Sequence, residues 1–209
     1  MPISAAIEEA LLKAASALSS ATLHEAAGRV GALPTNIKPI DPTMTICARA
    51  FPVRCPPGDN LWIHRALAAA APGEALVVDT GAGREYGYWG EIMGTSAQAR
   101  GLAGLVISGG VRDVAALRKL GLPTFSACVS IRDTVKDPSA DGAFGEAVAI
   151  GDVRISRGDL VFGDADGVVV LTPDQARSAV RVGIDRDAQE LAILDRVRAG
   201  ALTLDVYKL

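Results

Sequence analysis

The sequence predicts an α/β fold whose sheet is at least partly parallel. Segments with helical periodicity alternate with short apolar segments of strand length through the middle of the chain. Almost half of the residues are hydrophobic but only 4% are aromatic, so small and branched aliphatic residues build most of the core, as is typical of α/β proteins. The 209 residues show no internal repeat, low-complexity tract or linker, and we therefore expect residues 1–209 to form one domain.

The first half of the chain is expected to begin with two helices, after which strands and helices alternate. Apolar residues at helical spacing predict a helix over residues 4–18, and Thr22-Leu23-His24-Glu25 resembles a capping box that starts a second, short helix. After a proline-containing loop, strands and helices are expected in turn at residues 45–53, 59–70 (with Asp59 as the N-cap), 74–79, 91–101, 104–108, 112–120 and 124–129. Strands that are joined through helices pair in parallel.

The second half of the chain has a different pattern. Four short apolar segments are separated by turn dipeptides of glycine and aspartate, and they predict strands at residues 147–150, 153–155, 160–163 and 168–171. A final helix is expected from Pro173 to Arg198.

The bulk composition excludes several classes of protein. The net charge is −3 and there is no basic stripe, which argues against nucleic-acid binding. The three cysteines, Cys47, Cys55 and Cys128, include no C-x-x-C pair, so we expect neither a disulfide scaffold nor a zinc knuckle, and a reducing cytoplasm suits the chain best. The first residues lack the basic start of a signal peptide, and no apolar run reaches 18 residues, so we expect no membrane span.

Two strand-to-helix corners carry complementary polar groups. One is Gly109-Gly110-Val111-Arg112-Asp113, and the other is Gly90-Glu91-Ile92-Met93. The Asp113 carboxylate can hold a divalent cation, and the Arg112 guanidinium can hold an anionic substrate beside it. The first backbone N–H groups of a helix bind carboxylates or phosphates, and Gly90 would let an anion approach them. Because ligands bind beyond the carboxyl ends of strands in open α/β sheets, we expect one site built from both corners.

Each of these residues also has an ordinary structural explanation. Glu91 lies in a first helical turn, where acids complement the helix dipole. Asp113 would be equally ordinary at a helix start, and Arg112 on any surface. Their shared position at strand ends favours a functional site, and Mg²⁺ suits it because this ion keeps several waters and needs only one or two carboxylates.

Other chemistries fit the sequence less well. Gly81-Ala82-Gly83 lacks the third glycine of a dinucleotide-binding loop, and Gly-x-Ser-x-Gly is absent. The five lysines all fall on expected helix surfaces, loops or the terminus, which gives no support to a Schiff-base enzyme. His24 and His64 are distant from both corners in the sequence, so a zinc cluster has little support.

Several segments together resemble one family, and the resemblance covers nearly the whole chain. The segments are Thr22–Ala26, Pro57–Leu61, Trp89–Met93, Gly109–Asp113, Gly158–Val161, Asp164–Val168 and Leu204–Tyr207. They are similar to the 4-hydroxy-4-methyl-2-oxoglutarate/4-carboxy-4-hydroxy-2-oxoadipate aldolases, a family that also contains the ribonuclease E activity regulators. An acidic residue followed, after twenty residues, by Arg-Asp is the aldolase signature of that family, and Glu91 and Arg112-Asp113 match it.

The resemblance implies a fold and an assembly. The fold would be an α-β-β-α sandwich of the ribonuclease E regulator type with a mixed sheet. The assembly would be a homotrimer or a homohexamer made of two trimers, with sites between subunits. Glu190 matches an acid that in the family reaches a neighbouring subunit's metal-bound water, although a solvated helix face explains it equally well.

The resemblance also implies roles within the site. Asp113 would bind Mg²⁺ or Mn²⁺, and Arg112 would contact the keto oxygen and carboxylate of a pyruvyl unit. The backbone N–H groups of Ile92 and Met93, which follow Gly90, would hold the carboxylate. The expected reaction is metal-dependent retro-aldol cleavage of a 4-hydroxy-2-oxo acid to pyruvate and a second oxo acid, with oxaloacetate decarboxylation as a side activity.

The sequence departs from the aldolase pattern at one position and leaves two alternatives open. Glu91 stands where the aldolases of aromatic degradation usually carry Asp, and the extra methylene puts the preferred substrate in doubt. The regulators typically lack the acid at position 113, so Asp113 favours an enzyme. One alternative is a non-catalytic regulator that binds an RNA-processing ribonuclease. The other is a metal-dependent lyase for another oxo acid, with Arg84 in its loop as a carboxylate ligand or simply a solvated side chain.

Overall fold

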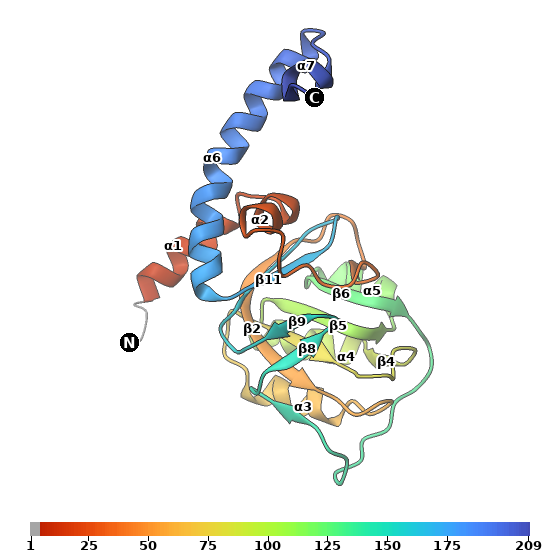
Figure 1. Ribbon diagram of the computed structural model, residues 1–209. Coiled ribbons are helices and arrows are strands. Elements are labelled where there is room, and N and C mark those ends of the chain that lie inside the picture. Colours follow the sequence, from red (N-terminus) through yellow and green to blue (C-terminus); the bar gives the residue numbers. More distant parts are fainter. Residues whose placement is uncertain (1–4) are drawn as a thin grey trace.

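The computed structural model describes residues 5–209, with side chains from Glu9 onward. Its centre is a curled, mixed sheet (Figure 1). Seven strands lie side by side in the order β1 (Lys38–Pro39), β6 (Thr124–Val129), β5 (Gly104–Val111), β3 (Glu74–Asp79), β2 (Ile46–Arg54), β10 (Leu160–Gly163) and β11 (Val168–Leu171). Two short strands join the same sheet: β4 (Gly87–Trp89) pairs with β5, and β7 (Ala143–Phe144) pairs with β2.

The central strands pair as the alternating pattern predicts. β2, β3, β5 and β6 are parallel to one another, whereas β10 pairs antiparallel with both β2 and β11. Their registers place Val77 and Val106 on one face of the sheet, and Val78 and Ile107 on the other. All of these side chains are fully buried, because both faces of the sheet are covered.

Three helices cover one face of the parallel strands. They are α3 (Leu61–Ala69), α4 (Glu91–Ala99) and α5 (Val114–Leu120), and they cover the sheet residues Phe51 of β2 and Tyr88 and Trp89 of β4. The opposite face holds a separate two-stranded sheet, β8 (Val148–Ile150) and β9 (Val153–Ile155), whose apolar residues pack with Phe125. These layers position the carboxyl ends of β3 and β5 between the helices and the small sheet (Figure 1).

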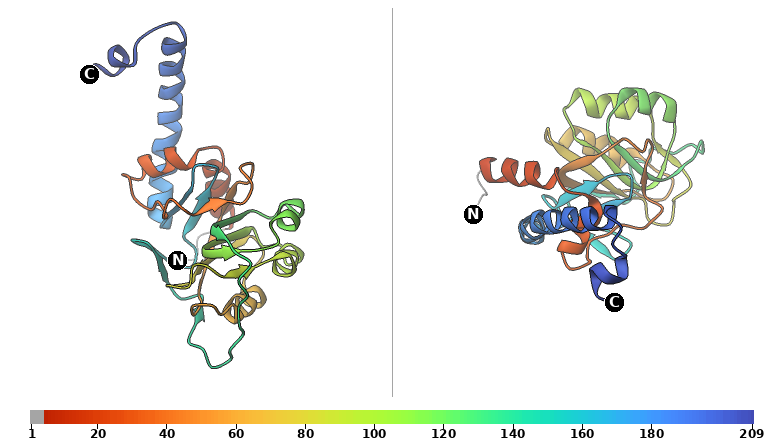
Figure 2. Two further views of the ribbon diagram at one scale, coloured as in Figure 1. Left: turned by 90° about the vertical axis from the view of Figure 1, so that its right-hand side faces the viewer. Right: turned by 90° about the horizontal axis from the view of Figure 1, so that it is seen from above.

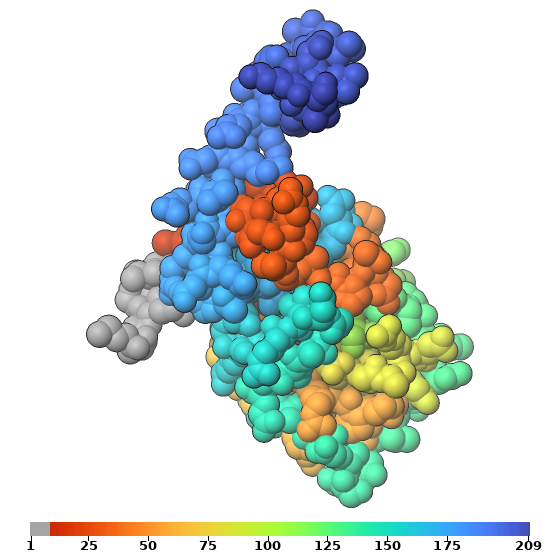
Figure 3. Space-filling model, viewed as in Figure 1, coloured from red at the N-terminus to blue at the C-terminus, as the bar shows by residue number. Residues whose placement is uncertain are grey.

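The remaining helices pack at the β10–β11 end of the sheet. They are α1 (Ala5–Ala15), α2 (Ser20–Ala26) and the first turns of α6 (Pro173–Arg198), which bury Ala176, Ala179 and Val180. After Gly183 the helix α6 buries none of its residues. It runs away from the body of the molecule and carries α7 (Thr203–Tyr207) at its far end, as Figures 2 and 3 show. No helix among residues 5–209 is both long and apolar enough to cross a membrane.

The α/β class with a mixed sheet is confirmed, and several boundaries need correction. The first helix ends at Ala15, and residue 4 of its expected span lies outside the described residues. The second helix begins at Ser20 because the hydroxyl of Ser19, rather than Thr22, caps it by accepting a hydrogen bond from the Thr22 N–H. Asn60 takes the N-cap position of α3, although the Asp59 carboxylate still accepts from the Leu61 N–H at 2.7 Å.

A larger correction concerns the corner at Arg112-Asp113. The expected strand 104–108 continues to Val111, so the two glycines lie within β5 rather than after it. They are required there by close packing, because a Cβ on Gly110 would stand 2.7 Å from the Tyr86 carbonyl oxygen. Arg112 and Asp113 then lie before the helix, which begins at Val114 and not at residue 112.

Candidate active site

The carboxyl ends of β4 and β5 open into a cavity of about 130 Å³. Its lining contains the sequence-predicted Arg112 and Asp113 together with three residues of the other corner, Gly90, Ile92 and Met93. The two corners that the sequence predicts to form one site thus line the same cavity within one chain. The rest of the lining comes from residues that local sequence reasoning did not select, namely Asn60, His64, Gly87, Tyr88 and Lys136.

Asp113 is held in a conformation that few residues adopt. Its φ and ψ of 56° and 36° lie in the left-handed region, and it is one of three non-glycine residues with positive φ in the described chain. This backbone turns the carboxylate back toward the start of α4, where Oδ2 accepts a hydrogen bond from the Glu91 N–H at 3.1 Å. This hydrogen bond therefore joins the Asp113 carboxylate of one corner to the first helical turn of the other.

Gly90 allows this contact because it has no side chain. A Cβ at this position would stand 2.3 Å from Oδ2 of Asp113 and 3.2 Å from Cγ of Arg112. The backbone of Gly90 is extended, with φ −150° and ψ −169°, so its dihedral angles do not require glycine. The requirement comes from the close approach of side chains, above all of the Asp113 carboxylate.

Arg112 is anchored by its backbone and oriented by a second acid. Its N–H donates to the Trp89 carbonyl at 2.8 Å, and its Nη1 donates to Oδ1 of Asp133 at 3.1 Å. Its Nε lies 4.0 Å from Oδ2 of Asp113, and its side chain is 42% exposed. The Thr134 N–H and then Arg112 hold the pKa of Asp133 below its usual value. A guanidinium with two acidic neighbours and an open face can still bind a substrate carboxylate or keto oxygen.

The start of α4 adds two backbone donors to the same cavity. Gly90, the N-cap residue, provides no side-chain cap, and the Glu91 N–H is occupied by Asp113. The N–H groups of Ile92 and Met93 belong to the first helical turn, where donors have no intrahelical acceptor. Donors of this kind, at the positive end of a helix dipole, are suited to an anion, and here they line the same cavity as Arg112.

Asn60, His64 and Lys136 enter the cavity from elements distant in the sequence. Asn60 is buried, and its Nδ2 donates to the Tyr88 carbonyl at 2.9 Å, while its Oδ1 has no hydrogen-bond partner in the described structure. Burial, together with the nearby positive charge of Lys136, lowers the pKa of His64. His64 is therefore neutral near pH 7, and Lys136 provides a cation next to it. The only predicted sequence feature near any of these three residues is the helix start at Asp59, which directly precedes Asn60 and lies about one turn before His64.

Glu91 and Glu190 are placed differently from the other predicted residues. The Glu91 side chain is exposed at the start of α4 and does not line the cavity, although its backbone N–H contacts Asp113. Glu190 lies on the projecting part of α6, where Oε1 accepts a hydrogen bond from Nε of Arg186 at 2.9 Å. Within one chain, Glu190 is thus not part of the cavity, and its role at a neighbouring subunit stays a prediction.

The donor atoms of the cavity suit one type of metal ion. Among the described residues, no cluster of three or more histidine, cysteine or acidic side chains is arranged to hold a metal. An ion that needs a complete protein cage, such as structural zinc, therefore has no matching donor set there. Asp113 offers one carboxylate that is 45% exposed, and this fits Mg²⁺ or Mn²⁺, which complete their coordination with water and substrate oxygens.

Comparison with known proteins identifies the family. Residues 7–170 match the family described as RraA-like, Aldolase/RraA. The chain belongs to this family. A protein of Halalkalibacterium halodurans with the provisional name 4-hydroxy-4-methyl-2-oxoglutarate aldolase is 32% identical over 171 residues, which cover 80% of each chain. A Burkholderia multivorans protein with the same provisional name is 33% identical over 112 residues, or 54% of this chain and 67% of the relative.

Solved structures show the same RraA-like fold. An uncharacterized protein from Pseudomonas syringae superimposes with a TM-score of 0.83 at 24% identity, over 97% of this chain and 92% of its own. The RNA-processing inhibitor RraA from Thermus thermophilis gives 0.65 at 23% identity, over 73% and 92%. Streptomyces coelicolor RraAS2, described as an unusual member of the RNase ES inhibitor RraA family, gives 0.75 at 26% identity, over 90% and 97%. Because the family contains both names, the site has to decide between catalysis and regulation.

Proposed function

We propose that this protein is a class II pyruvate aldolase. It would cleave 4-hydroxy-2-oxo acids, of the 4-hydroxy-4-methyl-2-oxoglutarate or 4-carboxy-4-hydroxy-2-oxoadipate type, to pyruvate and a second oxo acid. The observation that carries the proposal is the meeting of Arg112, Asp113 and the first N–H groups of α4 at one cavity. The names of the relatives in H. halodurans and B. multivorans support the same class of reaction.

The pyruvyl half of the substrate would lie between α4 and Arg112. The N–H groups of Ile92 and Met93 bind its carboxylate, and the Arg112 guanidinium contacts the keto oxygen. Removal of the proton from the C4 hydroxyl converts C4–O into a carbonyl and breaks the C3–C4 bond, whose electron pair enters the pyruvate enolate. Arg112 binds the negative enolate oxygen more strongly than the neutral keto oxygen, and this difference lowers the barrier. Protonation at C3 then releases pyruvate.

The distal half of the substrate would meet the residues that the fold adds to the cavity. The unsatisfied Oδ1 of Asn60 would accept a hydrogen bond from the C4 hydroxyl. Lys136 would attract the second carboxylate of a dicarboxylic substrate. We assign proton removal to a water held at the rim of the cavity by acidic side chains, with Glu91 of the same subunit and Glu190 of a neighbour as the candidates, since neither side chain lines the cavity within one chain. Oxaloacetate decarboxylation passes through the same enolate without a hydroxyl base, so we expect it as a side activity.

A divalent cation would complete this site, and Asp113 would hold it. When bound, Mg²⁺ or Mn²⁺ supplies Lewis-acid polarisation of the keto oxygen and carboxylate. The fixed left-handed backbone of Asp113 and the hydrogen bond from the Glu91 N–H orient the carboxylate for that task. Because the Asp113 carboxylate is partly exposed, substrate oxygens would also be able to reach a cation bound to it.

We propose that the chain assembles as a homotrimer or homohexamer in the cytoplasm. Large apolar side chains are exposed at the cavity, where Ile92 is 83% accessible, in the chain that follows β6, where Ile131 is 92% accessible, and on the projecting part of α6, where Leu191 is 60% accessible. Such surfaces are typical of contacts between subunits. Glu190 neighbours Leu191, so docking of this part of α6 would place the acid in the contact with another copy, and we propose that it meets that copy's cavity there. The three free cysteines are consistent with a reducing compartment.

Substitution of Arg112 tests the proposed function. Arg112→Ala removes a charge-assisted contact that strengthens in the transition state, and we expect a loss of about 3 kcal/mol, or about a hundredfold in kcat/KM for pyruvate release. Arg181→Ala is the matched control, since this exposed arginine lies on α6 and makes no ion pair within the described residues. Wild-type turnover by Arg112→Ala would contradict the assignment.

The second candidate is a regulator of an RNA-processing ribonuclease. The observation that favours it is the 26% identity to Streptomyces coelicolor RraAS2 over 90% of the chain. A regulator would act through its surface and would need neither Arg112 nor a cation. Capture of a ribonuclease E-type enzyme by the purified protein, together with no pyruvate release from any oxo acid, would support this candidate.

A further inference from the structure

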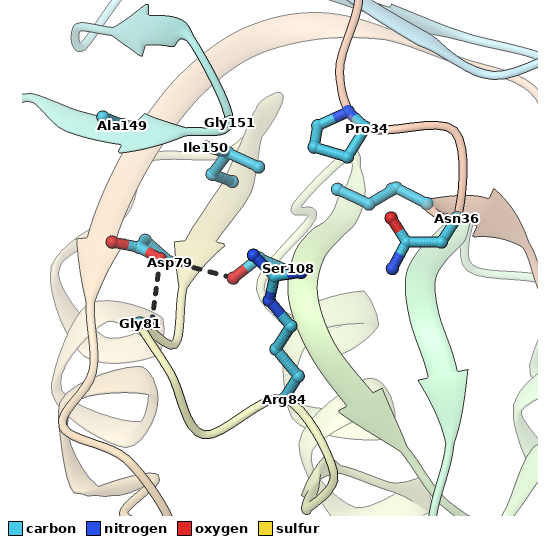
Figure 4. A pocket seen from close by; sticks show the side chains of 10 residues that line it. Pro34, Asn36, Asp79, Gly81, Arg84, Ser108, Ala149, Ile150 and Gly151 are labelled. Carbon is cyan, nitrogen blue, oxygen red and sulfur yellow. Dashed lines mark hydrogen bonds between the residues drawn. The ribbon is translucent and has the colours of Figure 1, made fainter.

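A second and larger cavity lies on the other face of the sheet. Its volume is about 290 Å³, close to the lower end of pockets that bind small ligands. It opens beyond the carboxyl end of β3, between the β8–β9 turn and the loop that precedes β1 (Figure 4). It shares no lining residue with the candidate active site, because Asp79 and Ser108 point to the face that carries β8 and β9.

Polar groups of both charges converge on one side of this cavity. Oδ1 of Asp79 accepts hydrogen bonds from the Gly81 N–H at 2.9 Å and from the Ser108 hydroxyl at 3.4 Å, and Oδ2 has no partner among the described residues. The Arg84 side chain extends from its loop toward Ser108, as Figure 4 shows, and Asn36 approaches from the opposite wall. Arg84 forms no ion pair with Asp79 or with any other described acid.

The Asp79 carboxylate is held in place by hydrogen bonds, whereas the Arg84 guanidinium has no ion-pair partner among the described residues. Ser108 is buried and is itself fixed by accepting from the Thr80 N–H at 2.9 Å, so the position of Asp79 is set by a network rather than by solvent. An acid and a base that face the same cavity without joining leave room for a molecule that bonds to both. Pro34, Ile37 and Ile150 form the remaining wall, which is apolar.

We propose that this cavity binds a small aliphatic carboxylic acid that carries a hydrogen-bond donor next to the carboxylate. The carboxylate pairs with Arg84, the neighbouring hydroxyl or ammonium group donates to Asp79, and the short aliphatic part packs against Ile150 and Pro34. Because both polar groups of the ligand form charge-assisted hydrogen bonds, binding requires the donor and the carboxylate in the same molecule. The proposal does not depend on the aldolase reaction, since the residues of the two cavities are separate.

Three nearly isosteric probes test this ligand class on the full-length protein: L-lactate, L-alanine and propionate. Saturation-transfer NMR titrations suit weak ligands and large assemblies. We expect L-lactate or L-alanine to bind saturably, and propionate to bind about tenfold more weakly because it lacks the donor. Stronger binding of L-alanine would identify an ammonium at Asp79, and stronger binding of L-lactate a hydroxyl.

Variants locate the binding. Arg84→Gln should weaken it about tenfold or more, whereas Arg181→Gln, which removes another exposed arginine without an ion pair, should leave it unchanged. Asp79→Asn keeps an Oδ1 acceptor for the Gly81 N–H but replaces the free Oδ2 by an amide donor, so it should abolish the advantage of L-alanine over propionate, whereas the L-lactate hydroxyl can accept from that amide and should lose less. Arg112→Gln separates the two cavities, because it impairs the candidate active site and should leave this binding intact.

Two results would overturn the proposal. One is the absence of saturable binding of both L-lactate and L-alanine to the wild-type protein. The other is binding that survives in Arg84→Gln and is lost in Arg112→Gln, which would assign the probes to the candidate active site. Failure of pyruvate release with intact probe binding would count against the aldolase reaction and not against this cavity.

Discussion

Gly90→Ala is the substitution that most directly probes how the two corners are joined. The new Cβ would stand 2.3 Å from Oδ2 of Asp113, and since Cβ contacts below 3.0 Å essentially never occur, an atom must move by at least 0.7 Å (3.0 − 2.3). The least costly movement is a rotation of the Asp113 carboxylate away from α4, which breaks its hydrogen bond to the Glu91 N–H. A misplacement of this size at a catalytic group costs roughly a hundredfold in rate.

The fold itself should tolerate this change. Gly90 has an extended backbone that alanine also adopts, so we expect the melting temperature to fall by no more than a few degrees. The assay is pyruvate release under saturating Mg²⁺, together with the Mg²⁺ concentration for half-maximal rate, which should rise. Thr95→Ala, an exposed position on the same helix, is the control and should behave as the wild type. A folded Gly90→Ala protein with wild-type kcat and Mg²⁺ dependence would refute this reasoning.

Further predictions concern the cation, a titratable side chain and the assembly. Asp113→Ala should lose the activation by added Mg²⁺, and a rate that still rises with Mg²⁺ as in the wild type would rule out Asp113 as the ligand. Burial and Lys136 lower the pKa of His64 below its ordinary value of 6.5, so the unfolded chain binds this proton more readily and stability should fall as the pH drops below about 6.5. His64→Gln should flatten that part of the melting temperature profile, and an unchanged acid limb would contradict the assignment. Sedimentation of the wild type should give three or six times the 21.5 kDa chain mass, and Leu191→Glu should shift it toward smaller species, whereas an unchanged sedimentation profile would argue against contacts through α6.

The sequence predicts the parallel core well because the relevant signals are local. Apolar runs such as Ala75-Leu76-Val77-Val78 are bounded by glycine, proline and acidic residues, and the helices between them have helical periodicity. The end of β5 could not be predicted in this way, since Gly109 and Gly110 are ordinary signals for a turn. Their place in the strand follows from the close approach of Tyr86 and Tyr88, which only the tertiary structure sets.

The residues of the candidate site are likewise predictable only where local motifs contain them. Arg112, Asp113 and Gly90 belong to contiguous motifs, and these predict a shared site because strand ends meet at one edge of a sheet. Asn60, His64 and Lys136 reach the cavity from a helix start and from the irregular chain after β6. No periodicity or spacing relates these segments, so only packing joins them. The direction of α6 away from the body is likewise absent from the sequence pattern that predicts the helix itself correctly.

The most direct test of the central claim is the release of pyruvate from 4-hydroxy-4-methyl-2-oxoglutarate and from oxaloacetate. A lactate dehydrogenase reports the product, and each substrate is run with Mg²⁺ and again with a chelator. We predict release of pyruvate from both substrates, its loss on addition of the chelator, and its recovery when Mg²⁺ is restored. No release from either substrate, with Mg²⁺ and Mn²⁺ both supplied, would contradict it.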